Sequence, residues 1–354
     1  MSNLTALLIQ PGAAWSTADL YNGYRDAWKA AGHTIVEYAL DKRVNAARSW
    51  LAYQYHHAGE GARAPTHNDA LYLASFESVI KALAHDVDWT VVFSGRMFHP
   101  GVFRALRKAG CKCAVVLTES PHEDEAQMWW ASLANVAFTN ERTSVGPLSA
   151  HNEHVHYLPH AYDPAKHHNG SGTDDFPDAP EHDVVFVGTN WPERVETFAA
   201  VDWSGINFGL YGLWRNLGSR HHLRRHLRSG LVDNDKTAAL YRHAAIGLNP
   251  YRQSVALAKG SARITTAESL NPRAVELAAC GCFSISDYHA EAEEVFGDLV
   301  PTYRTPTELE ALIRHYLAHP QERAEKAAQL PERVAGRTFA ALGQQIIETL
   351  EGYK

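Results

Sequence analysis

The strongest constraint on the fold of this chain is the alternation of short apolar runs with amphipathic stretches. LTALLIQ (4–10), WTVVFSG (89–95) and CAVVLTE (113–119) are continuous apolar runs, typical of strands buried on both faces. Helical patterns lie between such runs, for example DLYNGYRDAWKAAG (19–32), which ends at a glycine. Strands and helices that alternate with this short period predict an α/β fold with a parallel, doubly wound sheet.

A polar segment divides the alternation into two halves. Residues 163–182 are rich in Pro, Gly, Asp and Ser, as domain linkers are, and DVVFVGTNW (183–191) restarts the pattern. The length of 354 residues also suits two domains. We therefore predict two Rossmann-like, doubly wound domains that face a cleft: an N-terminal domain (1–165), a linker (166–182), a second domain (183–335) and a C-terminal helix (336–354) that packs back toward the first domain.

Hydropathy, net charge and cysteine content indicate which classes of protein this chain can belong to. No run of eighteen apolar residues predicts a membrane span, and MSNLTALLIQPG resembles a first buried strand more than a signal peptide. The formal net charge of -7 gives no general attraction to nucleic acid or anionic membranes. Two Cys-x-Cys pairs, Cys111/Cys113 and Cys280/Cys282, fit buried reduced thiols better than a zinc site. We expect a cytoplasmic globular protein.

The segment ESLNPRAVELAACGCFSISDY (268–288) carries the most chemistry. Asn271 suits an N-cap, Pro272 suits the first helical position, and Gly281 suits the end of the helix. The free N–H groups of such a helix start bind anions, and Arg273 adds a guanidinium for phosphate oxygens. This start therefore suits a diphosphate.

Two glutamates flank this helix start. Glu276, one turn after Arg273, could accept hydrogen bonds from a ribose cis-diol, and Glu268 could reach a sugar beyond the phosphates. The alternative is an ordinary capped helix in which Arg273 and Glu276 form an ion pair on a solvated face.

The motif resembles the donor site of retaining E-x7-E glycosyltransferases of the GT-B fold, and is closest to the CgeB-like (spore-maturation-protein-like) group. The matching residues in order are Ser269, Leu270, Asn271, Arg273, Glu276, Ala279, Cys280, Gly281, Phe283, Ser286, Asp287 and Tyr288. DVVFVGTNWPERVE (183–196), FGLYGLW (208–214) and LYRHAAIGLN (240–249) resemble further strings of that group.

The resemblance implies roles for individual residues. Glu276 would bind the nucleotide ribose and Glu268 the donor sugar, while Asn271 and Arg273 would lie beside the diphosphate. The remaining implied donor-site residues are Gly188 and Thr189 in a tight turn, Arg194 as a second phosphate cation, and Gly212 near the base. Arg194 could instead pair with Glu193 or Glu196, and Gly212 could be a simple turn glycine.

Glu119 and His122 follow the strand at 113–118 and are the candidates on the acceptor side of the first domain. An inverting enzyme would need one of them as general base, whereas a retaining enzyme of this type needs none. Charge stabilisation of the departing diphosphate, by Arg273 above all, would then carry catalysis, with Glu268 at the sugar. No carboxylate pair stands at a strand end, so no essential metal or other cofactor is expected.

We predict a glycosyltransferase that uses a nucleotide-diphospho-sugar, preferably a UDP-sugar, and retains configuration. The acceptor stays open among glycan, protein, small molecule and modified DNA, and residues 40–70 are the segment expected to face it. The basic stretch RNLGSRHHLRRHLR (215–228) keeps a DNA-base-modifying glycosyltransferase open, although a basic, solvent-facing helix explains it better. A nucleotide-sugar 2-epimerase and a non-catalytic nucleotide-sugar-binding protein are further alternatives. A nicotinamide-dependent oxidoreductase is disfavoured, because QPGAAWSTAD follows the first strand in place of G-x-G-x-x-G.

Overall fold

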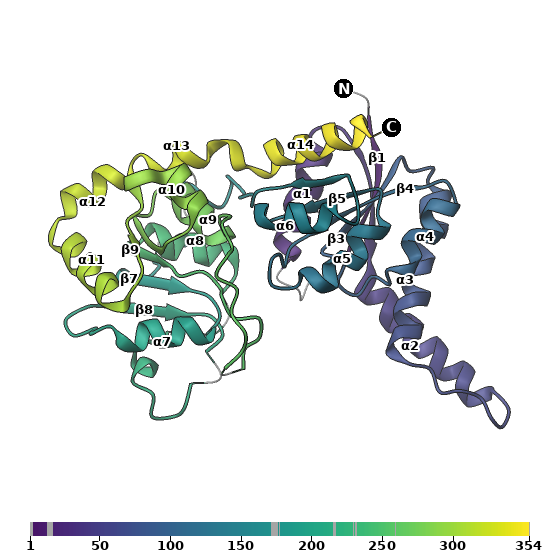
Figure 1. Ribbon diagram of the computed structural model, residues 1–354, viewed down its shortest axis with the longest axis horizontal. Coiled ribbons are helices and arrows are strands. Elements are labelled where there is room, and N and C mark those ends of the chain that lie inside the picture. The colour runs from purple at the N-terminus through teal and green to yellow at the C-terminus, as the bar shows by residue number, and fades with distance from the viewer. Residues whose placement is uncertain are drawn as a thin grey trace. The chain divides into compact units, whose positions relative to one another are not determined.

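The computed structural model describes residues 3–12, 17–170, 176, 178–214, 217–228, 230, 232–258 and 260–353. The chain forms two compact units, Met1–Pro159 with Phe339–Lys354, and His160–Thr338 (Figure 1). Part of the predicted linker, residues 171–175 and 177, lies outside the described residues.

The described part of the first unit holds a six-stranded sheet in the order β2-β1-β3-β4-β5-β6, and every strand pair is parallel. The strands are β1 (Thr5–Gln10), β2 (Thr34–Ala39), β3 (Trp89–Phe93), β4 (Lys112–Leu117), β5 (Val136–Thr139) and β6 (Val155–Tyr157). The helices are α1 (Ala18–Ala30), α2 (Leu40–His57), α3 (His67–Ala84), α4 (Gly101–Lys108), α5 (Asp124–Leu133), α6 (Arg142–Ser149) and α14 (Phe339–Gly352).

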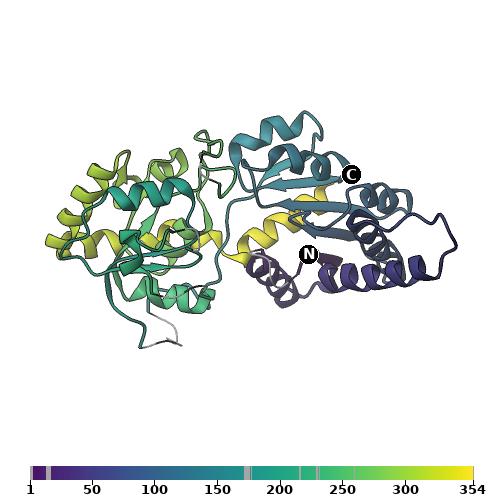
Figure 2. The ribbon, with the colours of Figure 1, turned by 90° about the horizontal axis from the view of Figure 1, so that it is seen from below.

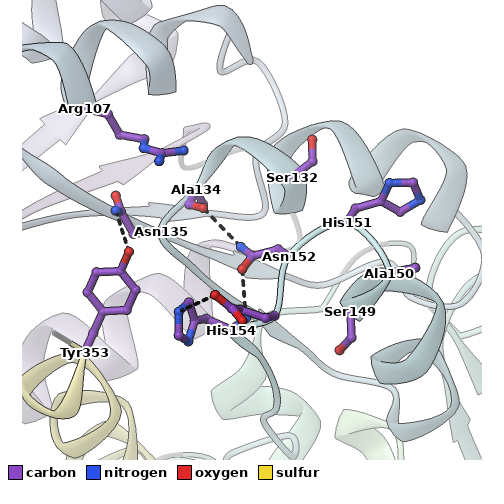
Figure 3. A pocket seen from close by; sticks show the side chains of 11 residues that line it. Arg107, Ser132, Ala134, Asn135, Ser149, Ala150, His151, Asn152, His154 and Tyr353 are labelled. Atoms are coloured by element: carbon purple, nitrogen blue, oxygen red, sulfur yellow. Dashed lines mark hydrogen bonds and ion pairs between the residues drawn. The ribbon is translucent and has the colours of Figure 1, made fainter.

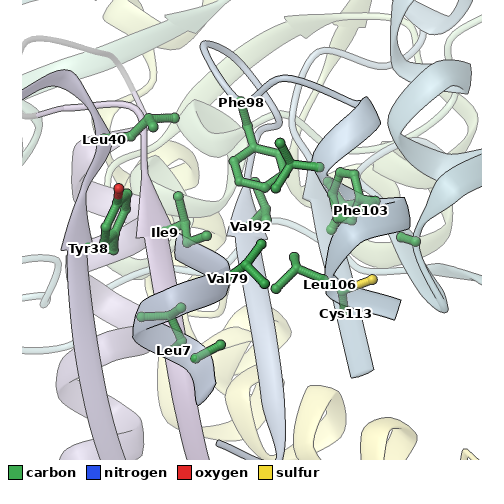
Figure 4. Packing of buried hydrophobic residues seen from close by; sticks show 14 of the residues in the cluster. Leu7, Ile9, Tyr38, Leu40, Val79, Val92, Phe98, Phe103, Leu106 and Cys113 are labelled. Carbon is green, nitrogen blue, oxygen red and sulfur yellow. The ribbon is translucent and has the colours of Figure 1, made fainter. Parts of the chain in front are cut away.

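Both faces of this sheet are buried, as the apolar strands predict. On one face Leu7, Ile9 and Val92 pack against α2 to α6 through residues such as Val79 and Phe103 (Figure 4). Helices α1 and α14 contact each other, and α1 contacts β1. Trp28 Nε1 of α1 donates to the carbonyl of Gly343 in α14 at 3.0 Å, which fixes the C-terminal helix to this unit.

The described part of the second unit holds a five-stranded sheet in the order β11-β10-β9-β7-β8, also parallel throughout. The chain passes from β7 to β8 on one side and then returns to β9 on the other, so the strand order reverses between β7 and β9. Ligands of open α/β sheets bind at the carboxyl ends of the strands at such a switch point. The strands are β7 (His182–Val187), β8 (Phe208–Tyr211), β9 (Ala244–Asn249), β10 (Ser284–Asp287) and β11 (Thr302–Tyr303).

Helices cover both faces of the second sheet as well (Figure 2). Val184 and Phe186 of β7 pack in a cluster with Phe198 of α7 and Ile313 of α11, while Val185 packs in another with residues of α8 and α9. The helices are α7 (Pro192–Ala200), α8 (Asn234–Arg242), α9 (Pro272–Ala279), α10 (Ala290–Phe296), α11 (Pro306–Ala318), α12 (Pro320–Ala327) and α13 (Leu330–Val334), with short 3-10 turns at His222–His226, Gly297–Leu299 and Ala335–Arg337.

Two local expectations need correction. HVHYLPH (154–160) is predicted from its sequence as a strand, but the structure pairs only Val155–Tyr157. The basic stretch 215–228 is not an α-helix in its described part, because it holds a 3-10 turn at His222–His226; Arg215 and Asn216 lie outside the described residues. Arg224 and Arg228 of this stretch donate to the carbonyls of Leu217 and Phe208, so these two cations brace the local backbone.

The prediction for the cysteines is confirmed. Cys111, Cys113, Cys280 and Cys282 are all free thiols and all buried. Burial raises the pKa of the Cys113 thiol to about 12, so this thiol stays protonated at neutral pH.

Candidate functional site

Helix α9 begins as its sequence predicts. The Oδ1 atom of Asn271 accepts the N–H of Ala274 at 2.8 Å, and Pro272 occupies the first turn. The helix ends before Gly281, whose φ of 63° lies in the left-handed region that favours glycine. The start of α9 lies near the carboxyl ends of β7 and β9, because Arg273 reaches both of them.

The Arg273 guanidinium is held by main-chain and amide oxygens. Its Nε donates to the carbonyl of Val187 at 2.9 Å, and Nη1 lies 3.4 Å from both Asn249 Oδ1 and the carbonyl of Pro250. The guanidinium also lies over the Phe186 ring at 4.6 Å from its centre. Within the described part of the chain it forms no ion pair with Glu276, so the alternative of a solvated Arg273–Glu276 pair is wrong.

Arg194, on α7, reaches the same place from the other side of the switch point. Its Nε donates to the carbonyl of Pro250 and its Nη1 to the carbonyl of Thr189, both at 3.1 Å, and it lies over the same Phe186 ring at 5.4 Å. Burial, and then the charge of Arg273, lower its pKa to about 9, so it stays charged at neutral pH.

The alternative partners of Arg194 are engaged elsewhere. Glu193 accepts the N–H of Gln253 at 2.8 Å and the Ser254 hydroxyl at 2.5 Å, and so anchors the segment after β9. Glu196 pairs with Arg263 at 2.6 Å. Arg194 therefore has no carboxylate partner among the described residues. It forms with Arg273 a paired-arginine site that three main-chain carbonyls, the Asn249 side-chain oxygen and the Phe186 ring support.

The two predicted glycines meet beside this paired-arginine site. A Cβ on Gly188 would lie 2.6 Å from Arg273 Nη2. A Cβ on Gly212, whose φ is 104°, would lie 2.2 Å from the carbonyl oxygen of Gly188. Gly212 therefore requires glycine, whereas a side chain at Gly188 would displace Arg273, because the turns after β7 and β8 touch each other and the arginine. Thr189 lies in the same turn, and its main chain accepts a hydrogen bond from Arg194.

The two glutamates of the motif differ in their surroundings. Glu276 is half-buried on α9, and its carboxylate forms no hydrogen bond or ion pair with the described residues, which leaves it available to a ligand. Glu268 is half-buried on the segment before α9, and its carbonyl accepts the N–H of Glu291 at 3.0 Å. Glu291 is buried, and its carboxylate accepts the Leu270 N–H at 2.5 Å and an Arg337 N–H at 2.8 Å. Glu291 thus fixes the approach to the start of α9.

Asp287, at the end of β10, is a site residue to which the motif assigned no role. Its two oxygens lie 3.1 and 3.3 Å from the N–H of Tyr251, the residue after the carbonyl that both arginines share. Burial raises its pKa to about 7, against the hydrogen bond from Tyr251 and the nearby charges of Arg194 and Arg273. An acidic residue at the last position of a strand, in the S-D-Y string, is the signal that could have found it.

In the first unit, Glu119 and His122 lie in the loop after β4, as predicted. Glu119 Oε2 lies 3.6 Å from Arg96 Nη2, and Glu123 Oε1 lies 2.5 Å from the same nitrogen. The N–H of Glu119 donates to Gln127 Oε1 at 3.1 Å. Arg96 follows β3, so the loops after β3 and β4 are joined by a charge cluster that the sequence did not reveal.

A cavity of about 450 Å³ lies elsewhere in the first unit (Figure 3). Asn135 and His154, which line it, directly precede β5 and β6, so it opens at the amino ends of these strands. Asn152 donates to the carbonyls of Ala131 and Ala134, and its role there is to cap the end of α5. This cavity is therefore on the opposite edge from the predicted residues Glu119 and His122.

No helix among the described residues is both long and apolar enough to span a bilayer. No group of three or more His, Cys, Asp or Glu side chains in the described ranges is arranged to hold a metal ion.

The chain is similar to known proteins in sequence and in fold. A family model described as "Glycosyl transferase-like" matches residues 176–347. A search of curated proteins finds no match. Sucrose-phosphate synthase from Thermosynechococcus elongatus is similar in structure, with a TM-score of 0.69, 14% identity and 98% of each chain covered.

Two further solved structures are similar. Anabaena HepE, solved in complex with UDP-glucose, has a TM-score of 0.67 and 15% identity, with 98% of this chain and 99% of that chain covered. Trehalose-6-phosphate synthase of E. coli, bound with UDP-2-fluoro glucose, has a TM-score of 0.61 and 13% identity over the same shares. These likenesses confirm the predicted GT-B fold, and together with the family model they support a glycosyltransferase.

Proposed function

We propose that this protein transfers a sugar from a nucleotide-diphospho-sugar, preferably a UDP-sugar, to a hydroxyl acceptor with retention of configuration. The observation that carries the proposal is the paired-arginine site, in which Arg194 and Arg273 converge on the Pro250 carbonyl without a carboxylate partner among the described residues. Two cations at the switch point of an α/β sheet, beside the start of a helix, suit a ligand with two negative charges close together. A diphosphate is such a ligand.

The remaining donor contacts follow from the motif. Glu276, unengaged and one turn along α9, would accept hydrogen bonds from the ribose hydroxyls, and Glu268 would contact the sugar. Gly188 and Gly212 would let the main chain approach the donor, with Thr189 in the same turn. UDP is preferred because HepE and the trehalose-phosphate synthase were solved with UDP-sugars.

In this reaction the bond between the anomeric carbon and the diphosphate oxygen breaks, and a bond to the acceptor oxygen forms on the same face of the sugar. The departing diphosphate gains negative charge, which the two guanidiniums and the N–H groups of α9 stabilise. The acceptor proton passes to the leaving phosphate, so no protein base is required. Glu119 and His122 stay candidates for an acceptor-side role, and no metal ion takes part in the proposed steps.

The CgeB-like group is the subtype that we propose, because the order Asn271, Arg273, Glu276, Cys280 and Gly281 follows its pattern. The acceptor stays open, since the described contacts of the first unit identify no acceptor chemistry.

The first test is thermal unfolding with UDP, GDP, ADP, CDP and dTDP, with NAD as a control ligand. A nucleotide present at about 100 times its Kd stabilises a protein by about 2.7 kcal/mol, a shift of several degrees in Tm. We expect this shift for the wild type and its loss in Glu276→Ala. Glu332→Ala, an exposed glutamate of α13, is the matched control and should keep the shift.

No shift with any diphosphate, or an equal shift in wild type and Glu276→Ala, would refute the proposed donor site. With the nucleotide identified, release of the free nucleoside diphosphate from its sugar nucleotide measures turnover. The anomeric configuration of the product, read by NMR, then tests retention, and the identity of the released sugar separates transfer from epimerisation.

A further inference from the structure

The paired-arginine site depends on one short turn after β9. The Pro250 carbonyl accepts from Arg194 Nε at 3.1 Å and lies 3.4 Å from Arg273 Nη1, and the Asn249 side chain lies 3.4 Å from the same Nη1. A shift of this turn would therefore move both guanidiniums together.

The adjacent strand β10 holds the turn in place. The hydroxyl of Ser286 donates to the Asn249 carbonyl at 3.0 Å, and the next residue, Asp287, accepts the Tyr251 N–H with its two oxygens at 3.1 and 3.3 Å. Of these two contacts, only the one between Asp287 and the Tyr251 N–H involves a charged group. Tyr251 directly follows Pro250, whose carbonyl both arginines contact.

The charge of Asp287 also interacts with the charges of both arginines. Arg194 from α7 and Arg273 from α9 both act electrostatically on Asp287, but neither forms an ion pair with it. The other titratable groups around it are Tyr251, Tyr303 of β11, and His289, whose Nε2 lies 3.9 Å from Asp287 Oδ1. Burial lowers the pKa of His289 to about 4 and raises the pKa values of both tyrosines, so these three groups are neutral at pH 7.

We propose that Asp287 is a positioning residue of the paired-arginine site, which holds the Asn249–Tyr251 turn and acts as the internal counter-ion that a bound diphosphate replaces. This inference rests on the proposed function and adds to it that binding of the donor is coupled to binding of a proton by Asp287. A diphosphate brings negative charge to the two arginines, and Asp287 then binds a proton more readily.

The coupling has a definite sign. The pKa of Asp287 in the free protein is raised by burial to about 7, and a bound diphosphate raises it further. Below the free pKa, Asp287 is already protonated and affinity does not depend on its titration. As pH rises above it, binding requires proton uptake, and affinity falls by up to about tenfold per pH unit.

Three substitutions test the proposal by isothermal titration with UDP-glucose, and with ADP-glucose and GDP-glucose in parallel. Both phosphates of these sugar nucleotides are esterified, so they lack the terminal ionisation near a pKa of about 6 that complicates free UDP. Measurements from about pH 6 to about pH 8 keep Arg194 mostly charged, because its pKa is lowered mainly by burial to about 9. Asp287→Asn keeps an acceptor oxygen for Tyr251 and removes the charge, Asp287→Ala removes both, and Asp298→Asn, at an exposed site, is the control.

We expect Asp287→Asn to bind like the wild type near the low end of this range and roughly three- to tenfold more tightly at its high end, with a flatter pH profile. Asp287→Ala should bind at least about tenfold more weakly at every pH, because the turn loses its acceptor. A residue that only stabilised the fold would not give opposite effects in the two variants.

Equal affinities and equal pH profiles of wild type and Asp287→Asn would overturn the inference and leave the proposed function standing. If Asp287→Ala fails to fold, this comparison alone decides the inference. Absence of binding by the wild type to all three sugar nucleotides would overturn the proposed function, and the inference with it.

Discussion

Gly188→Ala tests the geometry of the paired-arginine site with the addition of a single methyl group. The new Cβ would lie 2.6 Å from Arg273 Nη2 and 2.9 Å from the Phe186 ring. The guanidinium must retreat by about 0.8 Å to regain ordinary contact, because non-bonded atoms repel steeply below this separation. Its bond of 2.9 Å to the Val187 carbonyl can stretch only slightly, and its two contacts at 3.4 Å cannot stretch at all without being lost.

The expected cost falls on binding more than on folding. Gly188 does not have a φ in the left-handed region, so alanine is compatible with its backbone, and the arginine is a side chain that can move. A displaced charge-assisted hydrogen bond costs about 1.5–3 kcal/mol, which corresponds to roughly a 10- to 150-fold loss of affinity for the donor nucleotide. Titration calorimetry measures this loss. Thermal unfolding without ligand should show a folded protein whose Tm is lowered by the shift of the buried Phe186 ring.

Gly218→Ala is the matched control, since a Cβ at Gly218 meets nothing within 4 Å. It should bind nucleotide as the wild type does. If Gly188→Ala also binds like the wild type while its fold is intact, Arg273 does not contact the diphosphate from the position described, and the argument from the paired-arginine site fails.

Two further predictions concern stability. Glu291→Gln weakens the buried contacts of Glu291 with Arg337 and the Leu270 N–H, and should lower the free energy of unfolding by about 3–5 kcal/mol. Calorimetry should show this as a Tm lowered by roughly 10 °C. Glu332→Gln, at an exposed position, is the control and should leave Tm unchanged. Burial lowers the pKa values of His160 and His289 to about 4, so the unfolded chain binds protons first as pH falls. These two histidines should therefore lower stability as pH falls from about pH 7 to pH 4, while Asp287, whose pKa burial raises to about 7, acts in the opposite direction. The comparison of variants is therefore decisive: Tm should decline more gently with falling pH in His289→Gln than in the wild type, and equal pH profiles of the two would contradict the buried neutral state of His289.

The start of α9 could be predicted from sequence because all of its signals are local. Asn271, Pro272 and Gly281 act on their own backbone or on a neighbour within one turn, and the structure shows the predicted cap from Asn271 to Ala274. The fold class was predictable for a similar reason, since strands such as β3 and β4 are mostly apolar and are buried on both faces along most of their length.

The apolar pattern of the sequence does not predict helix α2, because the exposed face of this helix also carries large aromatic side chains. Its buried residues Leu40, Val44 and Ala47 follow a helical spacing, but Trp50 and Tyr53 are each 55% exposed and disturb the pattern. Large aromatic residues count as core residues in any reading of periodicity. Only the packing of α2 against α3 shows which face is inside.

Buried carboxylates were the other failure of sequence reasoning. Asp287 and Glu291 are mostly buried, yet acidic residues are exposed in most proteins, and their partners Tyr251, Leu270 and Arg337 are distant in sequence. A carboxylate is tolerated inside a protein only where such partners converge, and convergence depends on strand order.

The repulsion between its two charges distinguishes the paired-arginine site from a structural ion pair. Two guanidiniums that share one carbonyl repel each other, and the lowered pKa of Arg194 reflects its burial and this repulsion. A carboxylate in contact with Arg194 would remove the repulsion, and Glu193 on the same helix is bound to Ser254 instead. An arrangement that is unfavourable for the free protein and becomes favourable once an anion binds is the expected signature of a binding site rather than of a structural ion pair. The position of this arrangement, where the strand order reverses between β7 and β9, supports the same conclusion from topology alone.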